Sequence, residues 1–345
     1  MIHVQSHASC LTDALLCALL RASQTRLPAN VCTSEQLEAY LKSCDPLCRE
    51  TFFLVEAIPA IQSRDGFLCW PTPVPSPYLE NNHVWAKAFW IGGGEPARAP
   101  TVIFLHALMS TGDFGYHRIA ARFNAAGWNA VLIQLPYHGR RRPRGLPNGA
   151  LAFTADLPRN GETLRQAVVE VRQLMAWLKA QGCPEFGLIG TSYGGWVGAL
   201  VSFLEADFRF VTLLQPVTDI EHILWHSPAG AALRPLLARA GIEPGATCRH
   251  AHLTSPLHGR PLAPLERVVI VGGAYDRITP PLVLQKLVQR WDGVRYAEVR
   301  QGHFGYAAMG KALELLPPAV GLKRPIPYRP PAGSDPKRGQ QAAVD

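Results

Sequence analysis

The chain has 345 residues, of which 48% are hydrophobic and 17% are charged, and its formal net charge is +8. This composition excludes an intrinsically disordered chain. The length is enough for one large α/β domain with insertions, or for two modest domains. No uncharged apolar run reaches the roughly 18 residues of a membrane-spanning helix, so no transmembrane segment is expected. The basic residues form no stripe interleaved with aromatic side chains, which argues against a nucleic-acid partner.

The eight cysteines match no disulfide framework. Cys44 and Cys48 are four positions apart, and no second cysteine pair or histidine pair completes a zinc site with them. We therefore expect unlinked thiols, no bound metal and a reducing, cytoplasmic location. The first segment, MIHVQSHASCLTDALLCALL, is interrupted by Asp13 and has no Lys or Arg before its apolar part. It predicts an amphipathic helix and not a signal peptide.

Residues 1–80 are expected to form a helical N-terminal extension that carries no motif of recognisable function. The pattern predicts helices at 10–22 and 34–43 and a short strand or extended apolar segment at 51–58. Four prolines at 71, 73, 75 and 77 then predict a stiff connector.

Strands and helices alternate from Val84 onward. Apolar runs predict strands at 84–91, 101–106, 129–136, 186–190, 209–216, 267–273 and 294–299. Helical patterns cover 115–126, 161–182 with Asn160 as its cap, a segment from Gly194, 280–291 and 305–316. The alternation predicts an α/β fold with a doubly wound, mostly parallel sheet over residues 81–316. A helical, proline-broken insertion spans about 219–263, and a proline-rich basic tail, disordered at its end, spans 317–345.

Ser192 stands in the segment GLIGTSYGGWVG, between Gly190 and Gly194, where a predicted strand gives way to a predicted helix. This is the context of a G-x-S-x-G nucleophile elbow, in which a strained turn lifts the serine oxygen into a crevice. A Cβ two positions before or after the serine would clash, which explains both glycines. The alternative is a tight turn without chemistry.

A nucleophilic serine needs a base and a carboxylate, which follow it in the chain order acid, then histidine. Asp276 comes just after the strand at 267–273, and His303 just after the strand at 294–299. Their alternatives are a helix N-cap and an ordinary loop histidine. Asp219, which follows the strand at 209–216, is the rival acid.

The segments GTSYGG, GGAYDRITPP, GHFG, FLHALMSTGD and LPYHGRRRP make residues 84–316 similar to the α/β-hydrolase superfamily. The resemblance implies a catalytic triad of Ser192, Asp276 and His303 and no cofactor. It also implies an oxyanion hole of two backbone N–H groups, those of Leu108 and Tyr193, with the N–H of Met109 as an alternative to that of Leu108.

Five side chains are candidates for the substrate pocket, because they follow the strand ends at the crevice or lie in the insertion: His106, Met109, Tyr137, His138 and Trp225. The insertion is expected to cover the crevice as a cap, with ordinary core packing as the alternative. His250 and His252, within it, are expected at the surface.

Four arginines cluster at 140, 141, 142 and 144. They predict either a solvated loop or a preference for an ester with an anionic end, since the guanidinium group binds carboxylate and phosphate through paired hydrogen bonds.

These features predict a serine hydrolase that cleaves a carboxylic ester of a small molecule, with lipid esters and thioesters as further possibilities. A peptidase or a C–C hydrolase is compatible with the same fold. The alternative from another class is a non-catalytic α/β-hydrolase-like binding or scaffold protein.

Overall fold

The computed structural model describes residues 2–25, 31–93, 96, 98–110 and 112–322. Within them, nine strands form one mixed sheet in the order β1-β2-β3-β5-β4-β6-β7-β8-β9. Neighbours from β5 to β9 run parallel, whereas β1, β2 and β3 pair antiparallel at one edge. The strands are β1 Gln62–Arg64, β2 Phe67–Pro71, β3 His83–Phe89, β4 Thr101–Leu105, β5 Asn129–Ile133, β6 Phe186–Thr191, β7 Phe208–Leu214, β8 Val268–Gly273 and β9 Arg295–Val299.

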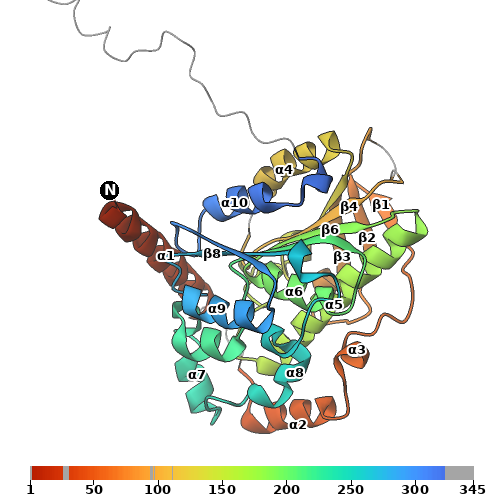
Figure 1. The fold of residues 1–345 in the computed structure, drawn as a ribbon. Coiled ribbons are helices and arrows are strands. Elements are labelled where there is room, and N and C mark those ends of the chain that lie inside the picture. The colour runs from red at the N-terminus through yellow and green to blue at the C-terminus, as the bar shows by residue number, and fades with distance from the viewer. Residues whose placement is uncertain (1, 26–30, 94–95, 97, 111, 323–345) are drawn as a thin grey trace, which may run out of the picture.

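Helices cover both faces of the sheet. The α-helices of the described residues are α1 Ile2–Thr25, α2 Ser34–Cys44, α3 Arg49–Phe52, α4 Phe114–Ala125, α5 Leu157–Ala180, α6 Tyr193–Ser202, α7 Arg234–Arg239, α8 Ala251–Thr254, α9 Pro281–Arg290 and α10 Ala307–Leu315. Helices α4 and α10 lie together on one face, and α5, α6 and α9 lie on the other (Figure 1). The predicted α/β class and doubly wound, mostly parallel sheet are confirmed.

The central strands are buried on both faces, as expected for a parallel sheet between two helical layers. In β4, Val102 and Phe104 pack toward α4 and α10, whereas Ile103 and Leu105 belong to the larger core under α5 and α6. This alternation follows from the two-residue period of a strand. The strand order turns around at β4, between β5 and β6, and such a point opens a crevice beyond the carboxyl ends of the strands.

Several predicted boundaries need correction. Residues 51–58 form no strand, because α3 ends at Phe52 and irregular chain follows. The boundary at residue 81 falls inside the sheet, since β1 and β2 precede it. The long helix is capped by Asp156 through the Arg159 amide, not by Asn160, which instead binds the backbone of Thr154.

The insertion at 219–263 consists of short helical turns whose leucines join the main core. Leu224, Leu233 and Leu237 are buried there, and Leu236 packs against the same core. The segment also contacts the N-terminal region, where α2 and α3 lie against it. These leucines are therefore part of the ordinary core packing, which was the alternative to a cap over the crevice.

All eight cysteines are free thiols, as predicted. Of the helices that the structure describes, none combines the length and apolar character that a membrane span requires. Residues 323–345, most of the predicted tail, lie outside the described part of the chain.

Candidate active site

Ser192 occupies the turn between β6 and α6 with φ 53° and ψ −114°, a conformation that L-residues rarely adopt. The flanking glycines are required by close backbone approach. A Cβ on Gly190 would lie 2.4 Å from the Gly194 oxygen, and one on Gly194 would lie 2.3 Å from the Leu105 oxygen. The predicted reason for both glycines is confirmed, and strain of this kind is typical of functional sites.

One hydrogen-bonded chain joins the three residues expected to form the triad. The Nε2 atom of His303 lies 2.8 Å from Ser192 Oγ, and its Nδ1 atom lies 2.8 Å from Asp276 Oδ2. Both distances are those of good hydrogen bonds. The arrangement lets the imidazole accept the serine proton while its other nitrogen donates to the carboxylate.

Asp276 is held in place by several further donors. Its Oδ1 atom accepts from the amides of Ile278 and Thr279, and its Oδ2 atom accepts from Thr279 Oγ1 and Gln215 Nε2. The rival acid, Asp219, is used differently, because its Oδ1 atom accepts from the amides of Glu221 and His222.

The pKa values of the pair shift in opposite directions. Burial alone would lower the pKa of His303, but the Asp276 carboxylate outweighs burial and raises it above its ordinary value. Burial alone would raise the pKa of Asp276, but the charge and hydrogen bond of His303, with the Thr279 donors, hold it below its ordinary value. The pair thus favours an ionised carboxylate beside a basic imidazole.

His106 and His138 fix the loop that follows β4. Leu135 N–H donates to His106 Nε2, and Met109 N–H donates to His138 Nε2, both at 3.0 Å. Each Nδ1 atom donates to a backbone oxygen, that of Ala107 or Pro136. Burial lowers the pKa of His106 to about 4 and that of His138 well below its ordinary value. Two neutral histidines therefore use all their nitrogens to hold this loop.

The candidate oxyanion donors fall into two groups. The Met109 amide is engaged by His138, which removes the alternative donor. The amides of Leu108 and Tyr193 donate to no protein acceptor within the described residues. The Tyr193 amide also opens helix α6, whose N-terminus favours negative charge.

The other residues predicted for the substrate pocket lie in different parts of the domain. His106 and His138 line a cavity of about 140 Å³ together with Ser110 and Gln134. Tyr137 is buried away from it, with φ 65°, and its amide donates to Asn81. Trp225 is half-buried against the main core.

Two expectations about charged or polar side chains are wrong. His250 is buried, not at the surface: its Nε2 atom donates to the Leu41 oxygen and lies 3.3 Å from Asp45. His252 is exposed, as expected. Arg141 is fully buried and cannot meet a substrate, because its guanidinium forms a double hydrogen bond with Glu170 at 2.6 and 2.7 Å.

The other arginines do not form a single anion site. Arg140 stacks over Phe67 and Trp85 and pairs with Asp65, whereas Arg142 and Arg144 are exposed. The predicted preference for an anionic ester loses its basis, since the four side chains point to different environments.

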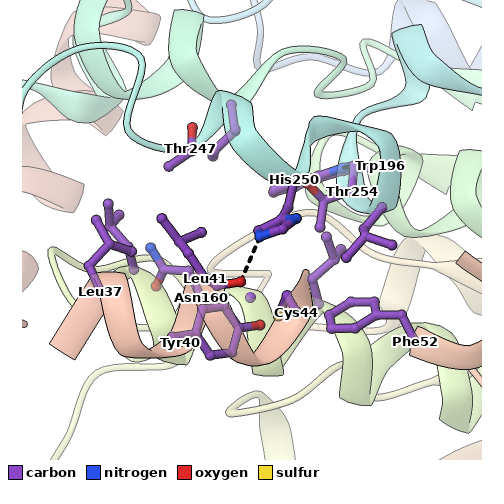
Figure 2. A pocket seen from close by; sticks show the side chains of 15 residues that line it. Leu37, Tyr40, Leu41, Cys44, Phe52, Asn160, Trp196, Thr247, His250 and Thr254 are labelled. Carbon is purple, nitrogen blue, oxygen red and sulfur yellow. Dashed lines mark hydrogen bonds between the residues drawn. The ribbon is translucent and has the colours of Figure 1, made fainter. Parts of the chain in front are cut away.

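Two further cavities lie near the site. One of about 200 Å³ is lined by Thr191, Gln215, Gly305 and Tyr306, close in sequence to Ser192 and His303. The other, of about 70 Å³, is apolar and lies between α2, α5 and the insertion, where His250 contacts the α2 backbone (Figure 2). Trp196, one turn after Ser192, lines it.

Two polar residues of the site were not predicted. Gln215 follows β7 and bridges Asp276 and the Gly302 oxygen through its side-chain amide. Asp13, on α1, accepts from the amides of His303 and Phe304. The available signal for Asp13 was its position on the same helix face as Cys17 and Leu20, both buried.

Comparisons with known proteins bear on the family and the fold of this chain. A sequence profile described as "Alpha/beta hydrolase domain containing 18" matches residues 84–222. An uncharacterized protein of Mycobacterium tuberculosis is 28% identical over 254 residues, covering 71% of this chain and 54% of the relative. The chain thus spans about half the length of the curated relatives it matches.

Among solved structures, acetyl xylan esterase 1 from Thermoanaerobacterium sp. JW/SL YS485 is similar with a TM-score of 0.55 at 16% identity, covering 88% of this chain and 98% of that one. Acetyl xylan esterase from Paenibacillus sp. R4 has a TM-score of 0.57 at 13% identity, covering 86% and 97%. At this identity the likeness concerns the fold.

Proposed function

We propose that this chain, which matches an α/β-hydrolase sequence profile over residues 84–222 and shares its fold with known esterases, is a serine hydrolase that cleaves carboxylic esters through an acyl-enzyme. The observation that carries the proposal is the hydrogen-bonded chain Ser192–His303–Asp276 on a strained serine. A serine that served only as a helix cap would need neither a histidine at its oxygen nor a positive φ.

In the proposed mechanism, His303 Nε2 takes the proton of Ser192 Oγ as the oxygen attacks the ester carbonyl. The oxyanion that forms accepts hydrogen bonds from the amides of Leu108 and Tyr193, which stabilise it by several kcal/mol, on the order of the effect of such donors elsewhere. Protonated His303 then gives its proton to the leaving alcohol. Water, activated by the same imidazole, releases the acid from Ser192.

Two features support an ester as the substrate. Two structural neighbours with TM-scores above 0.5 are described as acetyl xylan esterases. The cavities of about 140 and 200 Å³ share Ser110 and Gly112 of the loop after β4 and Tyr116 of α4, and they offer space for a small ester. The proposed substrate is a small-molecule ester; lipid esters and thioesters fit the same chemistry.

The test is labelling by a fluorophosphonate probe together with hydrolysis of an activated acetyl ester. The wild-type protein should be labelled and should turn over the ester. Ser192→Ala should lose labelling and lose turnover by on the order of 10³-fold or more, since the nucleophile is gone. Ser202→Ala is the matched control, because Ser202 is a buried serine on α6 that bonds the Ala199 oxygen instead of a histidine.

A folded wild-type protein with neither labelling nor turnover would instead support the binding or scaffold protein. Turnover by folded Ser192→Ala at the wild-type rate would contradict the assignment of the nucleophile. Circular dichroism and a thermal melt establish that each variant is folded.

A further inference from the structure

The N-terminal helix α1 reaches into the candidate active site through one carboxylate. Asp13 Oδ2 accepts from the His303 amide at 2.8 Å, and Asp13 Oδ1 accepts from the Phe304 amide at 3.3 Å. Asp13 is 2% exposed, so this carboxylate has left water for two backbone donors. Burying a carboxylate is costly unless hydrogen bonds replace those that it made to water. Both oxygens of Asp13 accept such a bond, so the contact is a specific one.

The face of α1 that carries Asp13 is the one that packs on the domain. Asp13, Cys17, Leu20 and Gln24 recur at helical spacing and are buried, and Gln24 donates to the Phe153 oxygen. The opposite face is exposed, including Leu11, Leu15 and Leu19. Docking of α1 therefore delivers the Asp13 carboxylate to the histidine loop.

His303 lies in the irregular segment between β9 and α10. Gln215 holds this segment through the Gly302 oxygen. Asp13 holds it through the amides of the next two residues, His303 and Phe304. A Cβ on Gly302 would come within 2.5 Å of Asp13 Oδ1, so the loop and the carboxylate are in direct contact.

We propose that Asp13 is a positioning residue for His303: its carboxylate clamps the His303 and Phe304 amides and fixes the imidazole between Ser192 and Asp276. The inference rests on the proposed function. It assigns a role in the hydrolytic site to the N-terminal extension. Small displacements of a general base are costly, up to about 10²-fold in rate for a shift of about 1 Å.

The charge of Asp13 gives the proposal a second measurable quantity, the pKa of His303. The charge of Asp13 adds to that of Asp276 in raising the pKa of His303. Two further titratable groups interact electrostatically with this cluster. The charges of Asp13, Asp276 and Arg277 act on Cys17 of α1, and that of Asp276 acts on His222 of the insertion. Asp13→Asn leaves those groups in place and removes one charge and one acceptor.

The first test compares Asp13→Asn with wild type in ester hydrolysis over a pH series. We expect kcat to fall by about 10- to 100-fold, because the imidazole is displaced from its place between Ser192 and Asp276. The acid limb of kcat/KM should also move to lower pH. Leu20→Ala is the matched control, because it loosens the packing of the same helix face and leaves the carboxylate.

The second test needs no turnover. In a Ser192→Ala background, NMR titration of ¹³C-labelled histidine, with His303 assigned by His303→Gln, should give a lower pKa for His303 in Asp13→Asn than in Asp13 protein. Leu20→Ala in that background should not reproduce the shift.

The outcomes separate the two proposals. If wild-type protein neither labels nor hydrolyses the ester, the proposed function fails, and the titration still decides whether Asp13 acts on His303. If wild-type protein is active while Asp13→Asn keeps its kcat, its acid limb and the His303 titration, this inference alone is overturned. It is also overturned if Leu20→Ala reproduces both effects, because Asp13 would then act only by docking α1.

Discussion

Asp276 accepts hydrogen bonds from four residues, namely His303, Gln215, Ile278 and Thr279. Such a set keeps a buried carboxylate ionised and fixes its direction, which in turn fixes the tautomer of the imidazole. Asp276 is therefore expected to act on the His303 imidazole through both its charge and its orientation.

The first residue-scale prediction concerns the acid. Asp276→Asn should lower kcat by about 10³- to 10⁴-fold, since the amide cannot accept from His303 while keeping its other bonds. Asp219→Asn is the same change at the rival acid and should keep most of the activity, because the described hydrogen bonds of Asp219 go to the nearby amides of Glu221 and His222 and not to His303. Steady-state kinetics on the activated ester measures both. The reverse pattern would move the acid to Asp219.

The second residue-scale prediction concerns pH. His303 must be neutral to accept the serine proton, and its pKa is raised above the ordinary value of 6.5. The value of kcat/KM should therefore fall as the pH drops through an apparent pKa above 6.5. In Asp276→Asn the limb should move to lower pH, because the partner that raises the pKa is gone. A limb at or below the ordinary value in wild type would contradict this account.

At the scale of elements, the loop 137–145 and helix α5 are joined by a buried ion pair. Arg141 also donates to the backbone oxygens of Gln134 and Asn81, so one guanidinium connects the residue after β5, the turn before β3 and α5. The arginine run looked like an exposed cluster in sequence. The sequence of the run does not reveal that Arg141 is the buried arginine, because its partner, Glu170, lies 29 positions away.

The prediction at this scale is one of stability. Arg141→Gln should lower the free energy of unfolding by about 3–5 kcal/mol, because Glu170 is left buried and unpaired. Arg142→Gln, at an exposed neighbour, should change it by within about 0.5 kcal/mol. Urea denaturation followed by circular dichroism gives both values. An Arg141→Met, Glu170→Leu double variant should lose less than Arg141→Gln; an equal loss would contradict the pairing argument.

The spacing of apolar residues predicted which strands and helices form better than capping residues and composition predicted where those elements begin and end. Apolar runs and helical stripes from Val84 onward correspond to β3 through β9 and their helices. Asn160 was the wrong cap because Asp156 lies one turn earlier, with Pro158 in the first turn. The segment 51–58 has the composition of a strand, but α3 ends inside it and no neighbouring strand pairs with it among the described residues.

At the scale of the whole molecule, the sequence located the three residues that the structure joins in one hydrogen-bonded chain. Chain order and strand ends were enough, because parallel strands bring their carboxyl ends to one edge. Their catalytic roles stay a prediction. Asp13 and Gln215 were missed because each acts through tertiary contacts, on a loop far away in sequence, that no local pattern records.

Asp13 and His303 lie 290 positions apart in the chain. On a ribosome, residue 13 emerges long before the strand that precedes its partner, so this contact closes only after nearly all of the sheet has been made. Closure of so long a loop makes the contact a late event in folding. The proposed triad needs His303, which follows the last strand, so it cannot form in the growing polypeptide. Under the proposed function, hydrolytic chemistry arises only once the domain is complete.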